Sequence, residues 1–268
     1  MLSTLESAGV RPASRMLYRA FSAIAHRRLR LHFRALRIAH ADRLAGITGP
    51  LIVYMNHSSW WDPLVGISVA NVLLPGRVGY APIDAAALKQ YGFFSRIGMF
   101  PVDQSSVRGA VQFLRASQAV LASGGMLWLT PQGHFVDMRE RPVRLRAGLG
   151  ALMHRLQGAV AVPLAAEYSF WNQPLPEALV QVGEPIVIGP TQRSSAEWTQ
   201  QLETNLQTAQ DELAVLSRAR DEQAFRVLLQ GGRGTSGVYG AWQRVRARLH
   251  GEAFRPDHEA SRSSRDAD

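Results

Sequence analysis

Short apolar runs alternate with stretches of helical spacing along most of the 268-residue chain. The apolar runs are typical of buried strands, and the other stretches repeat their apolar residues with the period of a helix. Strands are expected over residues 51–55, 77–81, 126–129, 159–166, 179–182 and 185–188, with a short one at the end of 92–103. Helices are expected over 63–74, 85–91, 107–123, 144–156 and from 194 to about 223. This order predicts an α/β fold with a mostly parallel, mixed sheet flanked by helices.

The two ends of the chain have a different character. Residues 15–40 interleave apolar residues with arginines, which predicts one or two basic amphipathic helices of the kind that lies on an anionic membrane surface. An ordinary surface helix packed on the domain is the alternative. Residues 1–14 are expected to be loosely held. A glycine-rich joint at 231–237 precedes a second basic amphipathic segment at 238–250, and the polar tail after it is expected to be disordered.

The charge of the chain narrows the classes of partner. The formal net charge is +9, almost all of it from arginine, with Lys89 the single lysine. Arginine binds carboxylates and phosphates through two parallel hydrogen bonds. Acidic lipid, nucleic acid and an acidic carrier protein are therefore all candidate partners. Nucleic acid is disfavoured, because the arginines lie on amphipathic segments and not beside an aromatic-rich strand platform. No apolar run reaches the roughly 18 residues that span a bilayer, and no secretory signal is evident, so we expect a soluble or membrane-surface protein.

Several types of site lack the residues they need. The chain has no cysteine, which excludes disulfides and thiolate metal sites. His57, His134 and His154 do not have metal-ligand spacing, and we expect no metal. The GxGxxG pattern at 232–237 follows a predicted helix and precedes no strand, so it indicates a hinge and not a dinucleotide site. A Gly-x-Ser-x-Gly elbow of a serine hydrolase is also absent.

The clearest chemical signal is the stretch YMNHSSWWDP at 54–63, at the end of the expected strand 51–55. His57 and Asp62 stand five positions apart at a turn from a strand into a helix. A histidine held there by a carboxylate forms a general base and its orienter, which can activate a hydroxyl or an amine by removing its proton. Alone the pair is a weak signal, because such spacings arise by chance.

Further blocks strengthen this signal. NHSSWWD at 56–62 resembles the NHxSxxD block of the glycerolipid acyltransferases, the lysophosphatidic acid acyltransferase-like family. GMFPVDQ at 98–104 stands where that family has G-x-I-F-I-D-R, and TPQG at 130–133 where it has F-P-E-G-T-R. VPLA at 162–165 matches the family's late V-P-x-A strand. Four blocks in the family's order identify the chain as a member over residues 51–184.

The resemblance implies an O-acyltransferase that lies peripherally on the cytoplasmic face of a membrane. His57 would take the proton from a hydroxyl of a lyso-glycerolipid, with Asp62 holding the imidazole, and the hydroxyl would attack the thioester of acyl-CoA or acyl-carrier protein. No cofactor is implied. Residues 46–190 then form the acyltransferase core, between a membrane-association segment (1–45) and a helical C-terminal extension (191–250) with a disordered tail (251–268). The expected substrate-binding residues are Asn56, Ser59, Gln104, Gln132, Gly133, His134 and Arg108.

The blocks depart from the family at the positions associated with the glycerol phosphate of the acceptor. Gln104 replaces the arginine that closes the second block. In the third block Gln132 replaces the glutamate, and His134 and Phe135 replace the Thr-Arg pair. Arginine is the usual residue for bidentate phosphate recognition, so these changes predict weaker phosphate binding by the motif itself.

Two readings of the acceptor stay open. In the first, the phosphate is still bound, either by another arginine (Arg108, Arg139 and Arg141 are near in sequence) or by hydrogen bonds from Gln and His. In the second, the acceptor is a lysophospholipid with a masked phosphate, a glycolipid, an aminolipid or a glycosylated isoprenoid. A non-catalytic basic protein that binds membrane or nucleic acid is the alternative from another class. Acyl length, donor, positional selectivity and oligomeric state are not specified by the sequence.

Overall fold

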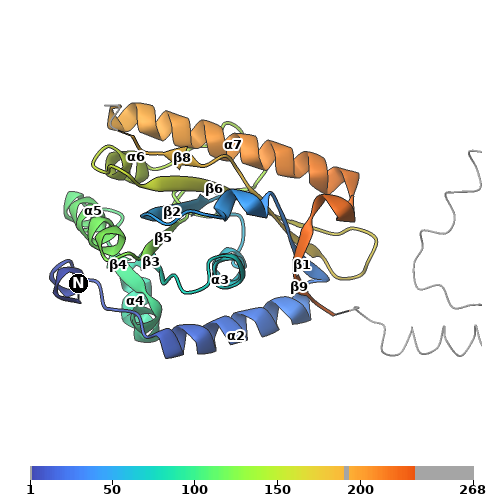
Figure 1. Ribbon diagram of the computed structural model, residues 1–268, viewed down its shortest axis with the longest axis horizontal. Helices are drawn as coiled ribbons and strands as arrows, with labels where there is room; N and C mark the ends of the chain where they lie inside the picture. The colour runs from blue at the N-terminus through green and yellow to red at the C-terminus, as the bar shows by residue number, and fades with distance from the viewer. Residues whose placement is uncertain (1, 190–192, 233–268) are drawn as a thin grey trace, which may run out of the picture.

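Helices cover both faces of one nine-stranded sheet in the computed structural model, which describes residues 2–189 and 193–232 (Figure 1). The strands are β1 (Ala35–Ala39), β2 (Leu51–Met55), β3 (Gly79–Asp84), β4 (Met99–Val102), β5 (Met126–Leu129), β6 (Val160–Ser169), β7 (Glu177–Val182), β8 (Ile186–Val187) and β9 (Arg226–Gln230). Their order across the sheet is β4-β3-β5-β2-β6-β7-β1-β9, and β8 pairs with β6. From β4 to β6 all neighbours are parallel, whereas the β6–β7, β6–β8 and β1–β9 pairs are antiparallel. The predicted mostly parallel, mixed sheet is confirmed.

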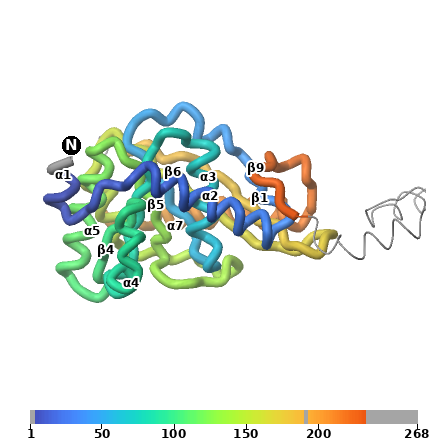
Figure 2. The backbone as a smooth tube through the Cα atoms, turned by 90° about the horizontal axis from the view of Figure 1, so that it is seen from below, coloured from blue at the N-terminus to red at the C-terminus, as the bar shows by residue number. Residues whose placement is uncertain are grey.

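The helices divide between the two faces. They are α1 (Leu2–Ser7), α2 (Arg15–His32), α3 (Asp62–Leu73), α4 (Ala85–Gln90), α5 (Val107–Ala122), α6 (Gly148–Met153) and α7 (Ser195–Ala219), with 3-10 helices at Ala41–Leu44, Gly92–Ile97 and Glu222–Ala224. In Figure 1, α6 and α7 lie above the sheet, and α3 and α2 lie below it. Figure 2, seen from below, shows α2 extending across this face to the end of the sheet formed by β1 and β9.

The central strand β2 shows why the chain folds into three layers. Its side chains alternate between the two faces, as they must in a strand. Ile52 and Tyr54 join the core under α5, α6 and α7, while Leu51, Val53 and Met55 join the core under α2 and α3. Every residue of β2 is buried, which matches a continuous apolar run in a strand covered on both sides. The chain leaves this strand at its carboxyl end, where ligands bind in open α/β sheets.

The predicted basic helix over 15–40 is correct only as far as His32. Residues 35–39 form β1 instead, between β7 and β9. Arg37 fits the basic pattern of the predicted helix, but it is buried and pairs with the buried Glu177 at 3.1 Å and with Glu222 at 2.8 Å. A buried arginine with two carboxylate partners gives the same sequence pattern as an arginine on a solvated helix face. The N-terminal segment therefore supplies a strand as well as a helix.

Smaller differences concern the ends of the chain and of single elements. Residues 1–14 were expected to be loose, but Leu5 and Val10 are buried in the core. The expected helix 144–156 is reduced to α6, because the residues before it follow the surface as a loop. Strand β9 lies where a helical extension was expected. The predicted basic segment 238–250 and the tail 251–268 lie outside the described residues. Within the described ranges, no helix is both long and apolar enough to cross a membrane.

Candidate active site

His57 and Asp62 meet in the turn between β2 and α3. Nδ1 of His57 lies 2.8 Å from Oδ2 of Asp62, which also accepts the backbone N–H of Ser59 at 2.9 Å. Asp62 begins α3 and is fully buried. Because a carboxylate only accepts hydrogen bonds, Nδ1 of His57 carries the hydrogen, and in the neutral imidazole Nε2 then has a free lone pair. His57 itself lies in the wall of a cavity, so this lone pair belongs to a side chain that a substrate can reach.

The turn that carries His57 is held on two sides. The Asn56 amide donates to the carbonyl of Ala166 at 3.0 Å and accepts the N–H of the same residue at 2.7 Å, which fastens the turn to β6. The N–H of His57 donates to Oε1 of Gln132 at 2.8 Å, and the His57 carbonyl accepts the N–H of Val136 at 2.8 Å. Asn56 and Gln132, expected to bind substrate, therefore use their amide groups on the backbone around His57.

Tyr168 is a member of this arrangement that the sequence did not reveal. Its hydroxyl donates to Oδ1 of Asp62 at 2.6 Å, from the far end of β6. Burial, and then the charge of Asp62, raise the pKa of Tyr168 well above its ordinary value, so the hydroxyl stays a donor. The position follows from sheet register: Met55 pairs with Leu164, and β6 continues beyond the end of β2 alongside the turn.

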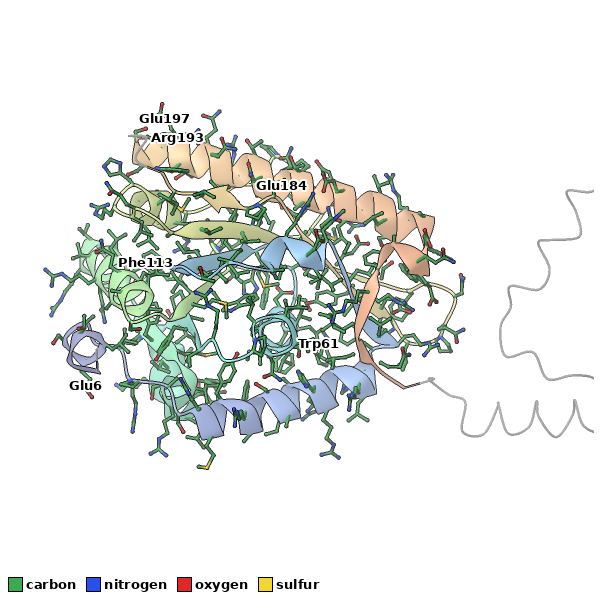
Figure 3. All side chains as sticks on the ribbon, viewed as in Figure 1. Glu6, Trp61, Phe113, Glu184, Arg193 and Glu197 are labelled. Carbon is green, nitrogen blue, oxygen red and sulfur yellow. The ribbon has the colours of Figure 1, made fainter. Side chains whose placement is uncertain are left out.

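A cavity of about 590 Å³ lies in front of His57. Its walls come from β3, β5, the start of α3, the start of α5 and the loops after β4 and β5, and they are mostly apolar. Two glycines make room for the Trp128 ring, since a Cβ on Gly66 or Gly79 would lie 3.3 Å or 3.2 Å from it. Phe113, labelled beside α5 in Figure 3, closes part of the wall. The volume suits a lipid chain or another small molecule of similar size.

Only some of the residues expected to bind substrate lie in this wall. Gln104 and Gly133 line the cavity together with His57 and Asp62. Ser59 supports the turn through its backbone, and its hydroxyl accepts the N–H of Trp61 at 3.2 Å.

His134 and Arg108 are exposed and lie outside the cavity wall. Beside His134, the exposed Phe135 covers His57, with ring centroids 4.4 Å apart.

Of the three arginines near the motif blocks, Arg108 lies outside the cavity wall and the other two pair with carboxylates elsewhere. Arg139 pairs with Asp137 at 2.6 Å, and Arg141 pairs with Asp211 on α7 at 2.5 Å. Arg146, which had not been considered, lines the cavity. Its backbone N–H donates to the carbonyl of Pro131 at 2.9 Å, which fixes it beside the third block.

The first three sequence blocks surround one cavity, and the fourth lies in the strand β6 next to β2. A strand-turn-helix unit presents His57 at the carboxyl end of a parallel sheet, in the wall of a mostly apolar cavity. The class of enzyme follows from comparison with known proteins.

Residues 32–167, half of the chain, match the model of the acyltransferase family. The chain belongs to this family and is an acyltransferase. Among solved structures it resembles the 1-acyl-sn-glycerophosphate (LPA) acyltransferase PlsC from Thermotoga maritima, with a TM-score of 0.50 and 12% identity over 74% of this chain and 79% of that one. This likeness confirms the predicted fold. A search of curated proteins gave no match.

Proposed function

We propose that this acyltransferase moves a fatty acyl group from acyl-CoA or acyl-carrier protein to a hydroxyl of a lyso-glycerolipid, with His57 as the general base and Asp62 as its orienter. The observation that carries the proposal is the 2.8 Å contact between Nδ1 of His57 and the buried Asp62 carboxylate, at the wall of an apolar cavity. It leaves Nε2 of the imidazole free to accept a proton from a bound alcohol.

The reaction balances with these groups alone. Nε2 of His57 takes the hydroxyl proton while the oxygen attacks the thioester carbonyl and forms the new C–O bond. The tetrahedral intermediate then expels the thiolate as the C–S bond breaks, and the imidazolium returns its proton to the sulfur. Asp62 keeps the imidazole in the reactive tautomer and stabilises its charged form. A cofactor is not required by this sequence of steps, and no acyl-enzyme is formed.

The cavity supports a lipid substrate. Its mostly apolar walls remove the chain from water, and burial of each methylene contributes about 0.8 kcal/mol. A second candidate acceptor is a lipid without a phosphate, such as a glycolipid, an aminolipid or a glycosylated isoprenoid. The observation in its favour is that Gln104 lines the cavity where the family has one arginine, and that Phe135, where the family has the other, places an apolar ring against His57.

The exposed face of helix α2 supports our proposal that the protein lies on the cytoplasmic surface of a membrane. It has no acidic residue, and its outward face exposes Met16, Ile24 and Leu31 by 75%, 56% and 59% among arginines. Large exposed apolar side chains bordered by arginine fit the interface of an anionic leaflet. Tyr18 of the same helix lines the cavity, so attachment through α2 would bring the cavity near the lipid.

Two tryptophans of the turn between β2 and α3, Trp60 and Trp61, also support this location. Trp61 packs against Phe33 and His32 at the end of α2, with ring centroids 5.0 Å apart in each pair, and is labelled there in Figure 3. Trp60 is 67% exposed. Tryptophan is favoured at the membrane interface, because it combines an apolar ring with one polar group. The catalytic turn is therefore close to the proposed contact with the membrane.

The proposal is tested by assaying acyl transfer from labelled acyl-CoA and acyl-carrier protein to a panel of lyso-lipids, glycolipids and a total lipid extract. His57→Ala should lower kcat by about 10²–10⁴-fold, the usual contribution of a general base, in a protein that is still folded at the assay temperature. The matched control is His154→Ala, which alters an exposed histidine whose Nδ1 lies 2.8 Å from the carbonyl oxygen of Arg193, outside the cavity wall. A fully active His57→Ala protein would refute the proposed mechanism.

A further inference from the structure

Arg146 occupies an unusual position in the catalytic cavity. Among the described residues that form the wall it is the single arginine, and no lysine accompanies it. No carboxylate of the described chain forms an ion pair with it. Arg146 is an exposed residue, so its unpaired guanidinium is open both to solvent and to a ligand that enters the cavity.

Gly133 allows the Arg146 side chain to lie against the turn at 130–133. The glycine has φ +74°, and a Cβ there would come within 2.4 Å of Nε and 2.9 Å of Cζ of Arg146. Any other residue would thus push the guanidinium away. At the other end, Nη1 of Arg146 is 3.5 Å from the carbonyl oxygen of Gln104, a long contact that leaves most of its donors free. The charge therefore lies between the loop after β4 and the loop after β5.

The carboxylates of Asp84 and Asp103 in the cavity wall form no ion pair with the Arg146 guanidinium. Asp103 lines the same wall, but its oxygens accept hydrogen bonds from Ser105 and Ser106. Asp84 caps α4 through the N–H groups of Ala86 and Ala87. Both acids thus have their own donors. A guanidinium group with free N–H donors beside an apolar cavity is suited to binding a molecule that has a lipid chain and a phosphate group.

We propose that Arg146 binds the phosphate of a substrate whose lipid chain enters the cavity, and that it thereby gives the enzyme a preference for a phosphate-bearing substrate. This inference rests on the proposed acyl transfer. It restores to the cavity a guanidinium that Gln104 and Phe135, at the family's two arginine positions, do not provide. Two sources share this chemistry: the head group of a lysophosphatidic acid acceptor, and the phosphates of acyl-CoA.

Kinetics of Arg146→Gln separate the two sources. The acceptors to compare are lysophosphatidic acid and a monoacylglycerol of the same chain, and the donors are acyl-CoA and the acyl thioester of N-acetylcysteamine, which has no phosphate. Loss of hydrogen bonds to a charged group should raise the KM for the phosphate-bearing partner about tenfold or more. A rise for lysophosphatidic acid alone assigns the acceptor phosphate, and a rise for acyl-CoA alone assigns the donor phosphate. Unchanged KM values for all four compounds would overturn the inference.

Two further variants sharpen the comparison. Arg144→Gln is the matched control, because Arg144 lies two positions away, is 76% exposed, contacts Glu203 on α7 and is not in the cavity wall. It should leave all four KM values as in the parent protein. Arg146→Lys keeps the charge but loses the planar fork, so it should fall between the parent and Arg146→Gln. Equal losses in Arg146→Lys and Arg146→Gln with a lowered Tm in both would indicate a structural role and would also overturn the inference.

Equilibrium binding distinguishes a failure of this inference from a failure of the proposed mechanism. Dissociation constants for lysophosphatidic acid and acyl-CoA are measured without turnover, in the His57→Ala protein with and without Arg146→Gln. At least one of them should weaken about tenfold on loss of the guanidinium. If His57→Ala is active but this weakening is seen, the role of His57 is wrong and the role of Arg146 stands. If neither constant changes, Arg146 does not bind phosphate.

Discussion

Replacement of Tyr168 by phenylalanine tests whether the base is held by three side chains and not by two. The change removes one hydroxyl and keeps the ring, so packing along β6 is preserved. It leaves Oδ1 of the fully buried Asp62 without the 2.6 Å hydrogen bond from Tyr168. A hydrogen bond to a charged group contributes about 1.5–3 kcal/mol, and we expect the free energy of unfolding to fall by an amount in this range.

The effect on catalysis should arise through Asp62. Without the Tyr168 hydroxyl, Oδ2 of Asp62 keeps the Ser59 N–H and His57 as partners, but the carboxylate can rotate about its Cβ–Cγ bond. We expect kcat to fall about 10–100-fold, the size of effect seen when outer partners of metal-bound histidines are removed. Asp62→Asn should itself cost about 10²–10⁴-fold, because it removes the support of the base.

A double-mutant cycle with Tyr168→Phe and Asp62→Asn measures how far the effect of Tyr168 on kcat depends on Asp62. In the Asp62→Asn protein, Tyr168→Phe should lower kcat by no more than about twofold, because its route to His57 is already lost. Single-turnover transfer is measured well below the Tm of each variant. Tyr54→Phe is the control: it removes another buried hydroxyl, which donates to the Leu202 carbonyl on the face away from the site, and should affect stability without affecting kcat. Equal losses from Tyr168→Phe in both backgrounds would refute the argument.

Two further predictions concern the membrane face and the pH dependence of stability. Met16→Gln combined with Leu31→Gln should weaken binding to anionic vesicles, measured by co-sedimentation, about tenfold or more, because each exposed apolar side chain can contribute about 1.5 kcal/mol or more on burial. Val215→Gln on α7 is the control. Unchanged binding of the double variant would contradict the role of α2. Hydrogen bonds, first from the Ser105 side chain, lower the pKa of Asp103 to about 2. This stabilisation is present above the ordinary aspartate pKa and is lost as pH falls through the lowered value. Asp103→Asn should therefore lower Tm at neutral pH and match the parent near pH 2; a difference that persists in acid would contradict it.

The strand and turn that carry His57 were predictable because their signals are local. An apolar run bounded by glycine and proline identified β2 and its limits, and the Asp62-Pro63 pair identified the start of α3. The family blocks then indicated which chain segments surround the cavity. These features depend on residues within a few positions of one another, so they can be predicted from one sequence without knowledge of the fold.

The features that could not be predicted depend on contacts between distant segments. Arg37 is 140 positions from Glu177, and without that partner it reads as a solvated helix residue. Tyr168 reaches Asp62 only because β6 continues beyond its pairing with β2. Arg146 enters the cavity because Gly133, thirteen positions earlier, has no side chain to exclude it. In each case the residue type was visible and its partner was not.

The pairing of β1 with β7 and β9 has a consequence for the order of events during synthesis. Strand β1 is made early, but its neighbours in the sheet end at Val182 and Gln230. A ribosome therefore has to release nearly the whole described chain before β1 has both partners and Arg37 has both of its carboxylates. Until then α2, which directly precedes β1, can pack on α3 and on residues 92–97 but not on β9, so the sheet edge formed by β1 and β9 is completed last.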